Sequence, residues 1–451
     1  MSAPANRPED GLPPAASRAV VKARRRIVPF LLLMYMVAFL DRTNVGIAKQ
    51  ALNVDLGISD AVFALGAGIF FVGYALFEIP SNLILYRVGA QRWMTRIMVT
   101  WGLISSGMAF VVGPTSFCVM RLLLGIAEAG FFPGVMLYLT FWFPQRSRAK
   151  VLGLFYIGYP MAMVAGNPLS GLLFHLSGLW GFAGWQWMFV VEGLLAVLMG
   201  IATFIILPNG PKVVSWLTEA ERAALDEILT EEAREIEGPR HEGMWKAFTS
   251  PLTICLVVFY GLMQIGSYGV VFYLPEQVSR ILQEGQGVYV GLVSAIPWLA
   301  AAFAVWLMPQ PVQRRLGLRP GIVLCLIGFS GGLVLSAIHG VVTGIVGLSL
   351  AASCIMVLSA LFWILPLSIF TGKRAAAVVA LINSIGNLGG FFAPNIRSLA
   401  DRFYETPKAG LYAIAMISIF AIALSMVLPL KNHAARERKG KEEALSGQHV
   451  F

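Results

Sequence analysis

Two charged pairs lie inside long apolar stretches of the chain. Asp41 and Arg42 are neighbours, and Arg121 stands seven residues before Glu128. On a helix, seven residues make about two turns, so Arg121 and Glu128 share one face and lie about 10 Å apart along the axis. A charge inside an apolar stretch is costly unless it faces a cavity or another helix. Both pairs are therefore candidate functional residues.

The residue types of these pairs indicate what each could do. An arginine keeps its charge and can hold a carboxylate through two parallel hydrogen bonds. Arg42 and Arg121 are therefore predicted to bind an anionic substrate. A carboxyl group in an apolar setting can bind and release a proton, so Asp41 and Glu128 are predicted to couple protons. The alternative is that both pairs are structural ion pairs that hold two helices together.

Other polar residues in the apolar stretches could line the same cavity or form hydrogen bonds between helices. The predicted substrate-binding set adds Asn44, Tyr74, Tyr268, Asn383 and Asn387. Two further acids are assigned structural roles. Glu78 lies near the end of the second apolar stretch and is predicted to anchor a helix end. Glu192 follows a pair of tryptophans typical of a membrane interface.

The sequence lacks the motifs of most other classes of protein chemistry. No phosphate loop of the form GxxxxGK followed by Ser or Thr is present, so an ATP-driven pump has no support. The four cysteines lie in apolar runs, where a thiol behaves as a small hydrophobic group, and the five histidines are scattered. No grouping of nucleophile and base indicates a hydrolase. We expect no enzyme activity, no cofactor and no metal site.

The elements that must position the charged pairs are membrane helices. The 451 residues are 57% hydrophobic and 13% charged, with a mean hydropathy of +0.73. A soluble domain carries about 25% charged residues, so a soluble enzyme is excluded. About 20 residues cross a bilayer as a helix. Twelve spans are predicted: 27–47, 61–85, 93–113, 115–141, 151–174, 186–207, 252–275, 288–308, 320–338, 342–369, 376–399 and 409–430.

The spans fall into two sets of six, which predicts an all-α membrane protein of two six-helix repeats. Arg148-Ala149 precedes Pro168, and Arg374-Ala375 precedes Pro394, each by the same interval in the fifth span of its half. The predicted organisation is a tail at 1–26, a first bundle at 27–207, a polar connector at 208–251, a second bundle at 252–430 and a tail at 431–451.

Basic residues predict the orientation. Most of the 34 Lys and Arg fall in alternate loops and in the tails, so both termini are predicted to be cytoplasmic. The net charge of +10 then reflects this topology and contact with anionic lipid, not nucleic acid. No signal peptide precedes the first apolar run, which is expected to remain as a span.

Several motifs together resemble the anion:cation symporter family of the major facilitator superfamily. The resemblance covers about residues 25–430 and lies in five runs: Leu40-Asp-Arg-Thr-Asn-Val45, Phe77-Glu-Ile-Pro-Ser-Asn-Leu83, Arg121-Leu-Leu-Leu-Gly-Ile-Ala-Glu128 through Gly134, Trp185-Gln-Trp187 with Glu192-Gly193, and Ala380-Leu-Ile-Asn-Ser-Ile-Gly-Asn-Leu-Gly-Gly390.

The resemblance implies proton-coupled uptake of an organic anion by alternating access. It implies proton and substrate roles for Asp41, Arg42, Arg121 and Glu128, and matches Tyr74 and Asn387 to substrate contacts of the family. The chain departs from the pattern at Tyr86, where the superfamily has an aspartate, and at Tyr159, where a galactonate-transporting relative has an amide. The first departure puts the gating role of that aspartate in doubt, and the second argues against galactonate as the substrate.

These observations predict a monomeric symporter of the bacterial inner membrane. Its expected partners are a small hydroxylated, sugar or aromatic carboxylate, protons and the lipid bilayer. The alternative is a proton-driven exporter of small molecules. Exporters of that kind commonly carry Gly-Pro in the fifth span, whereas this chain reads Gly158-Tyr-Pro160, and two intramembrane arginines disfavour a cationic cargo.

Overall fold

The computed structural model describes residues 12–236, 248–285, 287–338, 340–369, 372–406 and 408–427, and every regular element among them is a helix. The predicted tail 431–451 and part of the predicted connector lie outside these residues. The first half of the chain forms α1 (Pro14–Leu56), α2 (Asp60–Val88), α3 (Ala90–Gly107), α4 (Pro114–Glu128), α5 (Phe131–Thr140), α6 (Gln145–Tyr156), α7 (Gly158–Phe174) and α8 (Gly184–Ile206).

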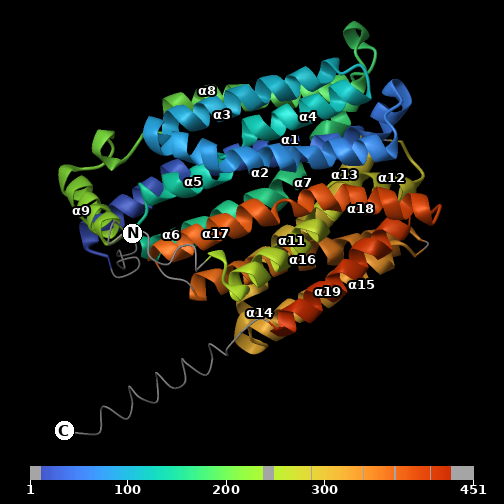
Figure 1. Cartoon of the computed structure of the whole chain (residues 1–451). Coiled ribbons are helices and arrows are strands. Elements are labelled where there is room, and N and C mark those ends of the chain that lie inside the picture. Colours follow the sequence, from blue (N-terminus) through green and yellow to red (C-terminus); the bar gives the residue numbers. More distant parts are fainter. Residues whose placement is uncertain are drawn as a thin grey trace, which may run out of the picture.

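The second half follows a short connector helix, α9 (Glu219–Ile236). It comprises α11 (Pro251–Val271), α12 (Leu274–Leu282), α13 (Val288–Leu307), α14 (Pro309–Arg315), α15 (Leu318–Ser336), α16 (Val341–Ile369), α17 (Gly372–Gly386), α18 (Gly389–Phe403) and α19 (Ala409–Val427). Figure 1 shows the two halves as two groups of long helices lying side by side.

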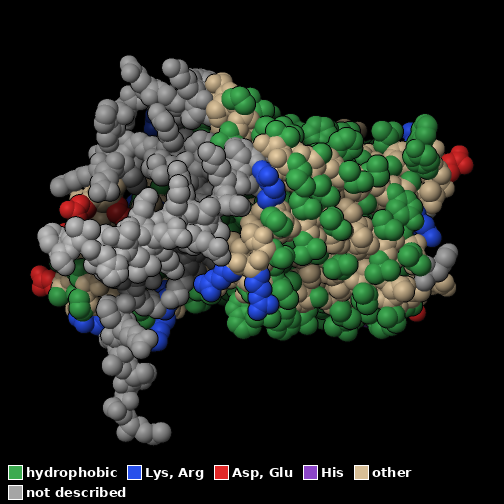
Figure 2. Space-filling model, turned by 90° about the horizontal axis from the view of Figure 1, so that it is seen from below, with side chains coloured by type: hydrophobic (Ala, Val, Ile, Leu, Met, Phe, Trp, Pro, Cys, Tyr) green, Lys and Arg blue, Asp and Glu red, His purple; other side chains and the backbone are tan. Residues whose placement is uncertain are grey.

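We call the end that carries α9 the connector end and the end that carries α12 the distal end (Figure 1). Between them, hydrophobic side chains cover the face seen in Figure 2, and charged side chains gather towards the two ends. Large apolar side chains such as Ile205, Phe303 and Phe420 are more than half exposed. Such a belt matches the hydrocarbon of a bilayer, where apolar exposure carries no penalty.

Nine helical segments in the described part of the chain are long and apolar enough to cross a membrane by themselves. The other three predicted spans correspond to α3, to α6 with α7, and to α17 with α18. The helix α3 carries Arg92 and Arg96, which lower its hydropathy, and the other two spans are each broken into two shorter helices. The described residues thus agree with the predicted all-α architecture of two six-helix repeats.

The break between α4 and α5 has a local cause. Gly130 adopts a φ of +88°, a left-handed conformation that suits glycine because it lacks a Cβ. A Cβ at this position would lie 2.3 Å from Oγ of Ser81 on α2. The break therefore follows directly after Glu128, the last residue of α4.

The two bundles meet chiefly through α2 against α18 and α7 against α13. Small residues let the backbones approach: a Cβ on Gly291 would lie 2.4 Å from the carbonyl oxygen of Asn167, and one on Gly171 would lie 2.6 Å from that of Gly287. Close approach of this kind is what small residues provide in membrane helices. Both α7 and α18 form the distal parts of their spans, so the bundles are closed together at the distal end.

The connector helix α9 packs on the first bundle. Glu221 accepts a hydrogen bond from Lys22 at 2.7 Å, and Glu232 accepts one from the backbone N–H of Gln145 at 2.8 Å. Burial would raise the pKa of Glu221, but the contacts with Lys22 and Thr218 outweigh it and lower the pKa. The described part of the connector is therefore an amphipathic helix held by ion pairs.

Candidate functional site

A cavity of about 60 Å³ lies between the two bundles. Its lining is rich in aromatic rings and contains few charged groups. The first bundle supplies Tyr35, Ala38, Phe39, Arg42, Tyr74, Glu128, Phe131, Phe132 and Tyr156, and the second supplies Tyr260, Gln264, Tyr268, Asn383 and Asn387. Mostly apolar walls with a few converging polar groups are typical of a small-molecule site.

Arg42 and Glu128 form the charged centre of this cavity. Nε of Arg42 donates to Oε1 of Glu128 at 2.6 Å, and its Nη2 contacts the same oxygen. Nη1 donates to the hydroxyl oxygen of Tyr268 at 3.3 Å, which links the pair to the second bundle. The guanidinium also lies over the ring of Tyr74, 5.1 Å from its centre. One arginine thus contacts α1, α2, α4 and α11.

Asp41 points into the first bundle instead of the cavity. Neighbouring positions on a helix differ by about 100°, so Asp41 and Arg42 meet different surroundings. The carboxyl group of Asp41 accepts hydrogen bonds from the hydroxyl of Ser105 and, at 3.4 Å, from the amide of Asn44. Asp41 is 1% exposed and absent from the cavity lining.

Arg121 lies in the same interior region as Asp41. Its Nε donates to the backbone carbonyl of Gly66 at 3.3 Å, and its guanidinium lies 4.9 Å from the ring centre of Phe70. It interacts electrostatically with Asp41, and its Nη1 has no hydrogen-bond partner among the described residues. The predicted site residues therefore separate into a cavity group and an interior group that contains Asp41, Asn44 and Arg121.

The second bundle contributes amides and hydroxyls to the cavity. Nε2 of Gln264 donates to Oδ1 of Asn387 at 2.8 Å. The hydroxyl of Tyr159 lies 3.3 Å from that of Ser267 on α11, a second hydrogen-bonded contact between the bundles. Of the predicted substrate-binding residues, Arg42, Tyr74, Tyr268, Asn383 and Asn387 line the cavity.

Glu78 lies at the interface between the two bundles, which its sequence position does not predict. The sequence predicts that Glu78 anchors the nearby end of the second span, and α2 continues ten residues beyond it to Val88 with Pro80 inside the helix. Glu78 is 1% exposed, and its Oε1 accepts a hydrogen bond from the amide of Asn383 across the bundle interface at 3.1 Å. Its spacing of four residues from Tyr74, one helical turn on the same face, was the available signal.

The sequence does not predict four further residues of the cavity lining: Gln264, Tyr35, Tyr156 and Tyr260. Tyrosines and amides are common in membrane helices, and no pattern along the chain separates those that face a cavity from those that pack between helices. Among the described residues no group of three His, Cys, Asp or Glu side chains is placed to hold a metal ion.

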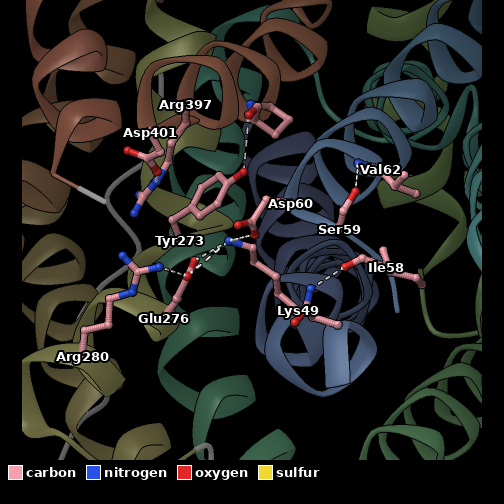
Figure 3. A network of polar contacts seen from close by, with 12 residues as sticks. Lys49, Ile58, Ser59, Asp60, Val62, Tyr273, Glu276, Arg280, Arg397 and Asp401 are labelled. Carbon is pink, nitrogen blue, oxygen red and sulfur yellow. Dashed lines mark hydrogen bonds and ion pairs between the residues drawn. The ribbon is translucent and has the colours of Figure 1, made fainter. Parts of the chain in front are cut away.

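Ion pairs close the distal end (Figure 3). Nζ of Lys49 on α1 lies 2.8 Å from Oδ1 of Asp60 on α2 and 3.0 Å from Oε2 of Glu276 on α12. Arg280 also donates to Glu276, at 2.5 Å. We call Lys49, Asp60, Glu276 and Arg280 the distal cluster. It joins the two bundles.

Arg397 adds a cation next to the distal cluster. Its guanidinium lies 4.0 Å from the ring centre of Tyr273, and its Nε lies 3.6 Å from Asp401 (Figure 3). Burial would raise the pKa of Glu276, but Lys49, Arg397 and Arg280 outweigh it and hold the pKa below its ordinary value. Glu276 therefore remains charged at neutral pH.

The chain belongs to the Major Facilitator Superfamily, whose family model matches residues 31–394. It is 38% identical to "Inner membrane transport protein RhmT" of Escherichia coli K12, over 93% of this chain and 97% of that protein. It is 39% identical to a "Putative tartrate transporter" of Agrobacterium vitis, over 96% of this chain and 95% of the relative. It is also 37% identical to a "Quinolone resistance transporter" of Acinetobacter baumannii, over 90% and 94%.

Solved structures show the same fold. The xylose transporter XylE from E. coli, in a partially occluded inward-open conformation, superposes with a TM-score of 0.70 at 12% identity, over 90% of this chain and all of that chain. A bacterial homolog of the lysosomal transporter Spinster, inward-facing and unoccupied, gives a TM-score of 0.71 at 17% identity, over 93% and 98%.

The chain is therefore a multi-pass membrane transporter that binds small molecules, and not an enzyme. The relatives named for tartrate agree with the motif resemblance described above.

Proposed function

We propose that this protein takes up a small organic anion together with protons by alternating access. The observation that carries the proposal is the Arg42–Glu128 pair in the cavity between the bundles. In this proposal the connector end faces the cytoplasm of a bacterium, the membrane is the inner membrane, and the protein works as a monomer.

The charge balance of the cavity explains why anion and proton would bind together. With Arg42 paired to Glu128, the cavity is neutral. An anion alone would leave one uncompensated negative charge in a low-dielectric region, which is costly. If Glu128 takes up a proton, Arg42 is free to hold the carboxylate of the substrate and the cavity is neutral again. Substrate binding and protonation of Glu128 therefore favour each other.

The polar groups around Arg42 fit a hydroxylated acid. Tyr74, Tyr268, Asn383, Asn387 and Gln264 offer hydroxyl and amide groups that can donate to a carboxylate or accept from a hydroxyl. Tyr268 and Asn383 already contact the first bundle. A substrate that replaces those contacts would draw the bundles together, as alternating access requires. The relatives named for tartrate make tartrate the first compound to test.

We assign supporting roles to the interior group, which consists of Asp41, Asn44 and Arg121. We assign Asp41 a proton-carrying role, and Arg121 and Asn44 the role of holding Asp41 in place, because none of these three residues belongs to the cavity lining.

The test compares acids with their neutral amides. Tartrate, other hydroxylated carboxylates and aromatic carboxylates are tested as competitors for binding to the reconstituted protein. Each acid is tested in parallel with its neutral amide. The proposal expects the acid to compete and the amide to fail at every pH, because only the acid offers Arg42 a charge. Equal competition by acid and amide would contradict an anion site.

An exporter is the second candidate, because one relative is named for quinolone resistance. Everted vesicles separate the two functions. When the lumen of everted vesicles is acidic, an exporter would accumulate its substrate inside them as protons leave. Under the same gradient a symporter would instead release a preloaded carboxylate together with protons.

A further inference from the structure

A second buried carboxyl group lies inside the first bundle, away from the cavity. Glu192 on α8 is 1% exposed, and its Oε1 accepts a hydrogen bond from the hydroxyl of Ser170 on α7 at 2.6 Å. Its Oε2 has no hydrogen-bond partner among the described residues. Burial of an acceptor oxygen without a donor costs free energy, so a proton or another cation bound to this oxygen would stabilise it.

Asn44 connects Glu192 to Asp41. Its amide nitrogen donates to Oδ1 of Asp41 at 3.4 Å, and Asn44 also interacts with the carboxyl group of Glu192. Oδ2 of Asp41 and Oδ1 of Asn44 lack partners in the described part of the chain, as Oε2 of Glu192 does. Three unpartnered acceptor oxygens thus belong to one connected group on α1 and α8.

The charges around this group do not balance. The groups that face Glu192 are Ser170 from α7 and Asn44 with Asp41 from α1. On α3, Ser105 donates to Asp41, and Ser106 donates to the backbone carbonyl of Val190. Among the described residues, the cations near this group are Arg121, which acts on Asp41, and Arg42, which is paired with Glu128. Asp41 and Glu192 therefore share one guanidinium between two carboxyl groups.

We propose that Asp41, Asn44 and Glu192 form an internal proton-binding site in which the two carboxyl groups share one exchangeable proton. The proposal rests on the proposed function, because it assigns this proton to the coupling of anion uptake. One proton supplies the missing donor and leaves one carboxylate opposite one guanidinium. Sodium is the alternative occupant of this site, and its effect on thermal stability distinguishes it from a proton.

Glu192 lies nearer the distal end than the cavity pair does. It is eight residues, about 12 Å, from the distal start of α8, whereas Glu128 is fourteen residues, about 21 Å, from the distal start of α4. A proton entering from the distal side would therefore meet Glu192 before Glu128. Glu192 becomes a proton-carrying residue that does not touch the substrate.

Infrared difference spectra between acidic and alkaline pH test the proposal on the full chain in lipid. A protonated carboxyl group gives its own C=O stretching band. Because Glu128 also takes up a proton in the proposed function, the variants are compared in a Glu128→Gln background, which should still show such a band that disappears as pH rises. Glu192→Gln keeps the size and the Ser170 contact, but leaves Asp41 opposite Arg121 alone. Asp41 should then stay ionised, and the band should be lost.

The matched variants give different signatures. Asp41→Asn leaves Glu192 without a cation, so a band should be present but should no longer change with pH. Ser106→Ala, which removes another buried contact of α8 without removing an acid, should match the Glu128→Gln background in the spectrum and in thermal stability. An unchanged pH-dependent band in Glu192→Gln would overturn the proposal.

Accumulation of tartrate under a proton gradient gives the transport consequence. Loss of one coupling proton should lower the maximal accumulation ratio about tenfold for each pH unit of gradient. Asp41→Asn and Glu192→Gln should lower it equally, and the double variant should lower it no further, since both remove the same proton. Additive losses would overturn the shared proton. So would sodium-dependent thermal stabilisation of the wild type that Glu192→Gln abolishes.

The proposed function and this inference can fail separately. A wild type that binds acids and amides equally would remove the anion site, while the infrared comparison still decides whether Glu192 and Asp41 share a proton.

Discussion

At the scale of single residues, Arg42 determines what the cavity can bind. It holds the only guanidinium among the described cavity residues, and it contacts Glu128, Tyr268 and Tyr74 from three other helices. A planar, permanently charged group can bind a carboxylate with two hydrogen bonds, and a lysine cannot reproduce this geometry.

Replacing Arg42 by lysine should therefore weaken binding although the charge is kept. We expect the dissociation constant of a transported carboxylate to rise about tenfold or more, because the loss of one charge-assisted hydrogen bond costs about 1.5–3 kcal/mol. Isothermal titration of the purified protein measures this change. Unchanged affinity in Arg42→Lys would show that Arg42 does not hold the carboxylate.

Replacing Glu128 by glutamine should separate binding from coupling. The variant keeps the shape of the side chain but cannot take up a proton, so gradient-driven accumulation should be lost, whereas exchange of internal for external substrate should continue. Counterflow and accumulation assays on the same liposomes measure both. If accumulation in Glu128→Gln stays near the wild-type value, the pair is a structural ion pair.

Residue types could identify candidates, but could not assign them to a cavity. Arg42, Tyr74 and Tyr268 were predicted from polarity inside apolar stretches, and these residues line the cavity. Arg121 and Asn44 satisfied the same criterion and lie inside the first bundle. The difference depends on how each helix is rotated against its neighbours, which no single-helix pattern contains. The roles of all these residues remain predictions.

At the scale of elements, the broken helices position the cavity groups. Glu128 ends α4 before Gly130, and Asn387 lies between α17 and α18. Breaks of this kind can be predicted from the sequence only in part. Glycines occur at them, but the chain has 46 glycines, so a glycine alone does not predict a break. The order of the spans was predictable from hydropathy, but their ends were not: α1 runs over Pro14–Leu56, whereas the predicted span is 27–47. The interruptions depend on contacts such as that of Gly130 with Ser81.

Gly130→Ala should destabilise the protein, whereas alanine at an uncrowded helical glycine should not. The left-handed φ and the contact with Ser81 together should cost about 1–3 kcal/mol. The shift should appear as a lower midpoint of thermal unfolding in detergent. Gly331→Ala is the control, because a Cβ there meets no atom within 4 Å. Equal midpoints for the two variants would contradict the strain argument.

At the scale of the whole molecule, the distal cluster lies where the two bundles meet and contributes an ion pair between them. Lys49 belongs to the first bundle and Glu276 to the second, so the ion pair between them exists only when the distal ends meet. The two-bundle architecture and the clustering of bases at the ends were predictable from hydropathy and charge. The partners of Lys49 were not, because Glu276 lies more than two hundred residues away along the chain.

Glu276→Gln should loosen the distal closure. Spin labels at Val54 on α1 and Glu284 beyond α12, in a cysteine-free background, report the separation of the bundles there. The variant should shift the distance distribution to longer values than the wild type, because two cations lose their shared carboxylate. An unchanged distribution would show that the helix contacts alone hold the distal end closed.

The same labels test the pH dependence of the closure. Because the pKa of Glu276 is lowered, its ion pairs are fully formed above the ordinary glutamate pKa and are lost only as pH falls through the lowered value. The wild-type distances should therefore stay constant from mildly acidic to alkaline pH. A distribution that changes near neutral pH would mean that another titrating group controls the distal end.

The central claim is that an anion and a proton cross together through the Arg42–Glu128 cavity. Its most direct test follows the external pH of a weakly buffered liposome suspension after addition of tartrate or another carboxylate that competes for binding. The claim predicts alkalinisation with the wild type, no alkalinisation with Glu128→Gln, and none with the matching amide. Uptake of the carboxylate without proton movement, or acidification of the medium during uptake, would contradict it.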